Sequence, residues 1–185
     1  MPTKGQILID KFTGDSIEFI ETSSDTNGER VTVKVTLKSK GQTVDDHIHI
    51  LQEESFNVLS GRMTYVIDGE QNYISAGEEV VLPKNKPHNH YNTSDEPAEF
   101  IQTIRPGIDV DLFLENLFGM INDGEVKEGK LPFLQAMVTG RYLESPSRLA
   151  AIPMGLQNVL INTIGPLARI FGYRAIYKKY TGIEK

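Results

Sequence analysis

Three histidines and one glutamate are spaced so that they could share a metal ion. His47 and His49 are separated by one residue, Glu54 follows five positions later, and His88 lies further along the chain. Residues two apart on a β-strand project to the same face, so the first two imidazoles converge. Glu54 and His88 come from separate stretches, and only a closed or folded sheet would bring them to that pair.

The donor set indicates which metals would suit such a site. Three imidazole nitrogens and one carboxylate fit a single divalent transition metal, namely Fe, Mn, Ni, Co, Cu or Zn, and leave coordination positions for water or substrate. The chain has no cysteine, which excludes thiolate zinc sites and disulfides. We therefore predict His47, His49, Glu54 and His88 as metal ligands.

Two residues are candidates for proton transfer. Glu54 could leave the metal and act as a base, and His90 lies two residues after His88, so it could face the same interior as a proton shuttle. The alternative for His90 is a hydrogen-bonded histidine near the mouth of the barrel. Glu53 should point away from the metal if its strand is regular.

The spacing of these residues resembles that of the cupin family. Gly41, His47, His49, Glu54 and Gly61 fit the first cupin motif at every fixed position. The second motif is matched by Gly77, Pro83, His88 and Asn92, but Asn85 stands where the family usually has a glycine. Asparagine tolerates the left-handed backbone conformation that such a glycine supplies, so this departure is compatible with the fold.

The resemblance covers about residues 30–106 and implies a double-stranded β-helix, or jelly-roll cupin barrel. It implies a small-molecule substrate and a metal-dependent enzyme, either dioxygenase-like, as in quercetinase-like cupins, or an isomerase or lyase. The alternative is a non-catalytic, metal-containing small-molecule binding or sensor protein. A third possibility is a barrel in which the four residues serve only structure.

Short strand-like segments separated by turn residues support a mainly β fold in the first part of the chain. Alternation is clearest at residues 31–38, where valine and leucine alternate with threonine and lysine. Other strands are expected at 16–21, 47–51, 55–59, 63–67, 79–82 and 99–104. We divide the chain into a cupin β-barrel domain, residues 1–106, and a helical C-terminal extension, residues 107–185.

The extension shows helical spacing of apolar residues. We expect one helix from Asp109 or Asp111, as N-cap, to about Ile121, and another from Pro132 to Tyr142. A third segment would start near residue 145 or 147, and Gly165-Pro166 should break or kink its apolar run. Such helices usually pack as core, although a basic, apolar segment could also lie on a membrane surface.

Charge and composition limit the partners. The formal net charge is -6, and all the negative excess lies in residues 1–106, so nucleic-acid binding is not expected. No signal peptide or spanning segment is recognisable, which makes a cytoplasmic location the default. The extension carries more apolar surface than a small barrel would bury, and sheet edges need cover, so we expect a homodimer.

Overall fold

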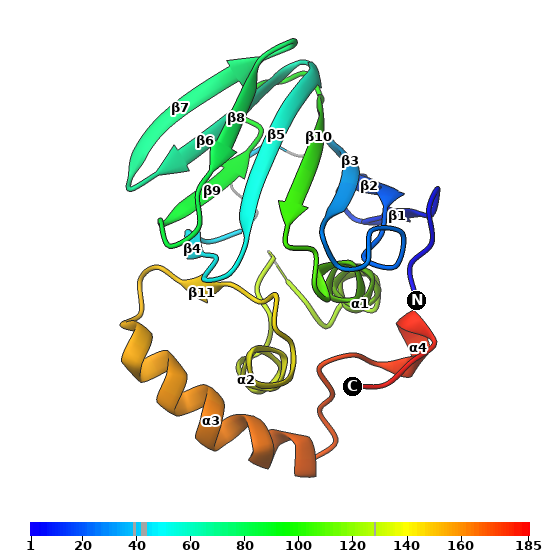
Figure 1. The fold of residues 1–185 in the computed structure, drawn as a ribbon, viewed down its shortest axis with the longest axis vertical. Helices are drawn as coiled ribbons and strands as arrows, with labels where there is room; N and C mark the ends of the chain where they lie inside the picture. Colours follow the sequence, from blue (N-terminus) through cyan, green and yellow to red (C-terminus); the bar gives the residue numbers. More distant parts are fainter. Residues whose placement is uncertain (39, 42–43, 128) are drawn as a thin grey trace.

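The computed structural model describes residues 1–38, 40–41, 44–127 and 129–185. Its fold is mainly β, followed by C-terminal helices, as predicted (Figure 1). The strands are β1 (Ile7–Ile9), β2 (Ser16–Glu21), β3 (Val31–Leu37), β4 (His47–Ile48), β5 (Glu53–Ser60), β6 (Arg62–Ile67), β7 (Glu70–Ser75), β8 (Glu79–Leu82), β9 (His88–Tyr91), β10 (Ala98–Arg105) and β11 (Arg148–Leu149). The helices are α1 (Val110–Asn122), α2 (Phe133–Tyr142), α3 (Met154–Ile170) and α4 (Lys178–Thr181).

The strands form two antiparallel sheets. The larger has the order β1-β2-β3-β10-β5-β8, and the smaller has the order β11-β4-β9-β6-β7. Many neighbours in the sheets are distant in sequence, such as β3 with β10 and β4 with β9. The pairing of β4 with β9 brings residues of the first motif next to residues of the second.

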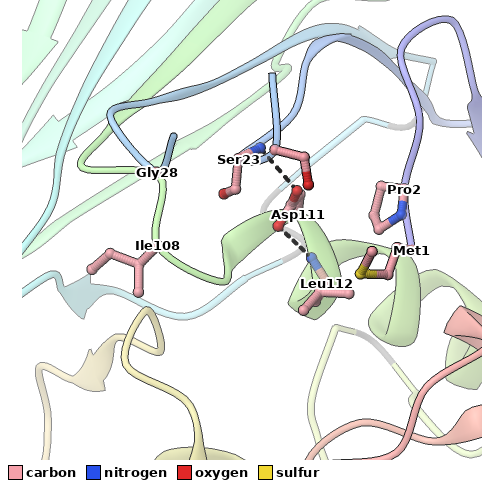
Figure 2. Close-up of a pocket in the computed structure, with 8 residues that line it drawn as sticks. Met1, Pro2, Ser23, Gly28, Ile108, Asp111 and Leu112 are labelled. Carbon is pink, nitrogen blue, oxygen red and sulfur yellow. Dashed lines mark hydrogen bonds between the residues drawn. The ribbon is translucent and has the colours of Figure 1, made fainter. Parts of the chain in front are cut away.

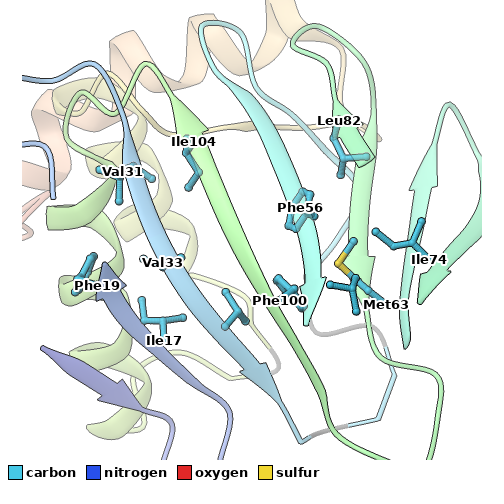
Figure 3. Packing of buried hydrophobic residues seen from close by; sticks show 13 residues of the cluster. Ile17, Phe19, Val31, Val33, Phe56, Met63, Ile74, Leu82, Phe100 and Ile104 are labelled. Atoms are coloured by element: carbon cyan, nitrogen blue, oxygen red, sulfur yellow. The ribbon is translucent and has the colours of Figure 1, made fainter. Parts of the chain in front are cut away.

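A continuous apolar core fills the space between the sheets (Figure 3). Val31, Val33 and Val35 point inward from β3, and Lys34 is only partly buried, as alternation along a strand requires. Phe56 from β5 and Phe100 from β10 are fully buried, with ring centroids 5.6 Å apart. Burial of these side chains stabilises the fold through the hydrophobic effect.

The predicted strands are all found, but several strands were missed and some bounds differ, with the largest difference at β4. The segment expected at 47–51 ends at Ile48, and β1, β7, β9 and β11 were not expected. β7 is an edge strand whose side chains are exposed apart from that of Ile74, so it lacks an apolar alternation. β9 has the sequence His-Asn-His-Tyr, which carries no apolar signal at all.

The extension corrects two predictions. Asp109 is the N-cap residue of α1 but makes no side-chain capping bond; its carboxylate accepts hydrogen bonds from the backbone N–H groups of Glu144 and Ser145 instead. Gly165-Pro166 does not break the third segment, because α3 continues through Pro166 to Ile170. Pro166 lacks an N–H for the helix ladder and its ring crowds the carbonyl four residues earlier, but the packing of α3 on α2 supports the helix.

The helices lie together at one end of the sheets (Figure 1). Val110 and Leu114 of α1 join the barrel core, whereas Leu112 and Phe113 pack against a second cluster formed by the extension. One helix thus contributes to both cores. In the part of the chain that the structure describes, no helix is long and apolar enough to cross a membrane.

Candidate metal centre

Four side chains from three strands and one loop converge inside the sandwich. His47 begins β4 and pairs in register with His88 of β9, and Glu54 projects inward from β5. His49 lies just after β4, where its carbonyl oxygen accepts a hydrogen bond of 2.8 Å from the backbone N–H of Asn85. One potential ligand atom from each of the four residues lies within 4.8 Å of the others.

The histidine tautomers favour metal binding. Nδ1 of His47 lies 3.0 Å from the carbonyl oxygen of Asp45, and Nδ1 of His88 lies 2.9 Å from that of Lys86. A carbonyl oxygen only accepts hydrogen bonds, so each Nδ1 carries the proton and each Nε2 keeps its lone pair. Backbone acceptors of this kind orient the histidine ligands of metal sites.

Three polar atoms within the group have unmet bonding capacity: His49 Nδ1, Glu54 Oε2 and His88 Nε2. Glu54 is 3% exposed and His88 is fully buried, and neither Glu54 Oε2 nor His88 Nε2 has a hydrogen-bond partner among the described residues. These two atoms are 3.6 Å apart, which is too long for a hydrogen bond. A buried acceptor pair without a donor is costly, and a cation would satisfy both atoms, so the residues fit a divalent metal.

The electrostatics keep the carboxylate charged and most of the histidines neutral. Burial alone would raise the pKa of Glu54, but His49, with Nε2 3.3 Å from Oε1, lowers that pKa well below its usual range. Burial lowers the pKa of His47 and lowers that of His88 to about 4. For His49, Glu54 outweighs the opposing effect of burial and raises the pKa. Ionised carboxylate and neutral imidazole are the forms that bind metals.

Two buried glutamines near the four residues were missed by sequence reasoning. Gln102 donates a hydrogen bond of 3.2 Å to Glu54 Oε1. Gln52 also contributes to the raised pKa of His49, and its amide donates to the carbonyl oxygen of Pro106, where the extension begins. The signal for Gln102 was available, because a polar residue between two inward apolar residues, Phe100 and Ile104, breaks the pattern of β10.

His90 lies beside the four residues rather than among them. It is on the same face of β9 as His88, and its ring centroid is 4.7 Å from that of Phe56 and 5.8 Å from that of Phe100. Its Nδ1 is buried without a hydrogen-bond partner among the described residues, and burial lowers its pKa to about 4. Glu53 is exposed on the opposite face of β5, as alternation predicted.

Motif residues outside the group shape the backbone. Asn85 has φ +63°, the left-handed conformation expected where the family motif has glycine. At Gly61 a side chain is impossible, because an added Cβ would lie 2.4 Å from the carbonyl oxygen of Pro97. Asn92 bonds to backbone atoms of Leu37, Glu96 and Ser94. These residues serve the fold, as predicted.

A hollow of about 250 Å³ lies away from the four residues, between the N-terminus and α1 (Figure 2). Asp111 lies in it with one carboxylate oxygen 3.0 Å from the backbone nitrogen of Ser23 and the other 2.9 Å from that of Leu112. Both oxygens are therefore used by the backbone. Nothing in the hollow repeats the donor set of the barrel.

Comparisons with known proteins place the barrel in a family. Residues 33–104 match the family model described as the Cupin domain. A quercetin 2,3-dioxygenase from Bacillus subtilis is 27% identical over 97 residues, which are 52% of this chain and 28% of that protein. The polyketide synthase CurC from Streptomyces cyaneus is 29% identical over 66 residues, 36% of this chain and 43% of that protein.

The solved structures include a sugar phosphate isomerase of the cupin superfamily from Silicibacter pomeroyi. It is 17% identical, with a TM-score of 0.47, and the match covers 56% of this chain and 75% of that one. The chain spans less than half the length of the two curated relatives. With both motifs in place and residues 33–104 matched, this segment of the chain is a cupin domain.

Proposed function

We propose that this protein is a metal-dependent cupin enzyme that holds one divalent transition metal with His47, His49, Glu54 and His88 and acts on a small organic substrate. The observation that carries the proposal is the pair of buried atoms without partners, Glu54 Oε2 and His88 Nε2, inside a group of four donors. A purely structural polar cluster would satisfy its own hydrogen bonds.

The bound metal would act as a Lewis acid on a substrate oxygen, or would bind an enolate-like substrate for reaction with O₂. When Glu54 leaves the metal, Oε2 is the carboxylate oxygen available to accept a proton from substrate, because it has no hydrogen-bond partner among the described residues. Gln102 and His49 restrain the other oxygen, Oε1, and thereby orient Oε2. His90 is the candidate proton shuttle. It lies two residues after His88 on the same face of β9, and its buried Nδ1 has no hydrogen-bond partner among the described residues.

The reaction class is proposed as dioxygenase-like, or as isomerisation or elimination. The similarity to quercetin 2,3-dioxygenase supports the first reading, although it covers 28% of that protein. Both classes need a metal-held oxygen and a nearby base, which the four residues and Glu54 provide. Fold alone does not choose between them.

A non-catalytic metal-containing sensor or binding protein is the second candidate. It is favoured by the fixed position of Glu54, whose Oε1 is held by two partners, Gln102 and His49. A catalytic base that leaves the metal must move, and two partners on one oxygen oppose that movement.

The experiment that tests the proposal has two stages. Metal content is measured by elemental analysis on the purified protein and after reconstitution with each of Fe, Mn, Ni, Co, Cu and Zn. The loaded protein is then screened for O₂ uptake with flavonols and other diols, and for isomerisation of small hydroxylated substrates. Absence of metal after reconstitution overturns the proposal, and metal without turnover favours the sensor.

We also propose that the protein acts in the cytoplasm on a small molecule, without nucleic acid, and forms a homodimer. The outward face of α3 is the best candidate interface. It exposes several apolar side chains along one stripe, Leu156, Val159, Leu167 and Ile170, followed by Phe171. Exposed apolar patches of this kind usually mark interaction surfaces.

A further inference from the structure

The extension adds a strand directly beside the strand that carries His47. β11 pairs antiparallel with β4, with Arg148 opposite Ile48 and Leu149 opposite His47. The backbone N–H of Ala150 donates a hydrogen bond of 2.9 Å to the carbonyl oxygen of Asp46. The helical region therefore contributes a residue to the sheet that holds two of the four donors.

The register determines where Leu149 lies. In an antiparallel ladder, hydrogen-bonded and non-hydrogen-bonded pairs alternate. Asp46 and Ala150 share a hydrogen bond, so His47 and Leu149 form a non-hydrogen-bonded pair, in which the Cα atoms approach to about 4.5 Å and the side chains lie closest. Paired residues project to the same face. Leu149 is thus the cross-strand neighbour of His47, and at 43% exposure it belongs to the rim rather than to the core.

A buried glutamine fixes Leu149 from the other side. Oε1 of Gln157 accepts a hydrogen bond of 3.1 Å from the N–H of Leu149, and its Nε2 donates one of 2.9 Å to the carbonyl oxygen of Leu149. Nε2 also donates to the carbonyl oxygen of Ile152 at 2.7 Å. Gln157 lies on α3 and is 6% exposed. Its side-chain amide makes the two hydrogen bonds to Leu149 that a further strand would make at this sheet edge.

We propose that Leu149 is a specificity-determining residue of the metal centre and that Gln157 is its positioning residue. Leu149 offers an apolar wall next to the ligand His47, which favours a substrate whose hydrocarbon or aromatic part lies beside its metal-bound oxygens. The inference rests on the proposed metal function. It adds that the extension, and not only the barrel, selects the substrate.

The test uses two probes with the same metal-binding group, acetohydroxamate and benzohydroxamate. Protein reconstituted with Co(II) is titrated with each, and the dissociation constants are obtained from the visible absorption of the metal. Wild type should prefer benzohydroxamate, and Leu149→Ala should reduce the preference about tenfold, since apolar contacts at a binding site are worth roughly this much. Acetohydroxamate affinity should stay within about twofold.

Control variants separate position from general damage. Leu59→Ala removes the same side chain from an exposed site on β5 and should leave the preference unchanged. Leu149→Gln keeps the size but not the apolar surface and should behave like Leu149→Ala. As a single substitution, Gln157→Leu should lower the preference by a similar factor. Combined with Leu149→Ala, it should cause no further loss of preference. A purely structural role of Gln157 would not give this result.

The outcomes distinguish the inference from the proposed function. If wild type takes up no Co(II) or other metal, the metal function itself is wrong. If it binds metal but shows no preference for benzohydroxamate, or if the preference survives both Leu149 variants, the metal function stands and the role of Leu149 is overturned.

Discussion

Two regions of the molecule differ from the usual burial pattern. Polar side chains are buried inside the barrel near β4, and apolar side chains are exposed on the outer face of α3. In the barrel, the charged or polar residues Glu54 and His88 are 3% and 0% exposed. On the extension, the apolar residues Ile170 and Phe171 are 79% and 80% exposed. Most charged groups are otherwise found outside proteins and most large apolar groups inside.

The two departures point to two kinds of partner. Inside the barrel, buried lone pairs without donors suit a cation. On α3, no Asp, Glu, Lys or Arg occurs between Arg148 and Arg169, although the helix is exposed along one side. A surface without charge is compatible with a second protein surface. Local violations of the folding rules therefore mark where function is expected.

The largest expected effect is on the barrel side of this comparison. We predict that His49→Ala or His88→Ala lowers the metal content from close to one ion per chain to less than about a tenth, because loss of an imidazole leaves too few ligands. Elemental analysis after identical reconstitution measures this. Tyr73→Ala, at an exposed residue of β7, is the control; retention of the metal in both histidine variants would contradict the prediction.

Two neighbouring glutamates offer a matched comparison within β5. Glu54→Gln should reduce metal affinity or abolish turnover, since it removes the buried charge that faces the histidines. Glu53→Gln alters an exposed side chain on the other face and should leave both properties unchanged. Isothermal titration with Zn(II) measures the affinities. Equal losses in the two variants would show that Glu54 has no special position.

A smaller effect is expected at a residue that touches no metal. Gln102→Ala should weaken metal binding about 10- to 100-fold, the usual result of removing a group that hydrogen-bonds to a metal ligand, here Glu54 Oε1. The same titration measures it. Gln6→Ala, a partly buried glutamine that bonds to Glu115 outside the site, provides the control. Unchanged affinity in Gln102→Ala would show that its hydrogen bond to Glu54 does not orient that ligand.

The exposed side of α3 is tested by adding charge. Val159→Glu should shift a dimer toward monomer by at least about tenfold in dissociation constant, because a carboxylate would be buried in the interface. Light scattering with sedimentation measures the mass. Tyr73→Glu places the same charge on the exposed β7 edge. If only Tyr73→Glu dissociates the dimer, the interface is on the barrel, and a wild-type monomer refutes the dimer altogether.

The two regions also differ in how far sequence reasoning reached. The spacing of His47, His49, Glu54 and His88 was sufficient to predict that they would converge, because the two motifs together include all the segments that carry them. The polar strand β9 and the exposed edge strand β7 escaped because no apolar face is visible in them. The pairing of β11 with β4 joins residues about a hundred positions apart. No local pattern in a two-residue strand encodes such a contact.

The smallest expected effect concerns the stability of the metal-free protein at acidic pH. The pKa values of His88 and His90 are lowered to about 4 from the usual 6.5, with burial as the main cause. Between these values the unfolded chain binds more protons than the folded one. The free energy of unfolding should therefore fall as pH drops from about 6.5 to 4, by on the order of 1 to 3 kcal/mol for each histidine.

The variant His90→Leu separates this titration from that of the metal-binding group. It removes one of the protons taken up on unfolding, so the slope of unfolding free energy against pH should decrease by up to about 1.4 kcal/mol per pH unit. Urea unfolding of chelator-treated protein at several pH values measures both slopes. Glu54 adds its own loss only at lower pH, because its pKa is lowered, and His49 acts in the opposite direction because its pKa is raised. An identical slope in wild type and variant would mean that His90 is protonated as readily in the folded barrel as in the unfolded chain. Its place between Phe56 and Phe100 would then be open to water, contrary to the packing seen in the barrel.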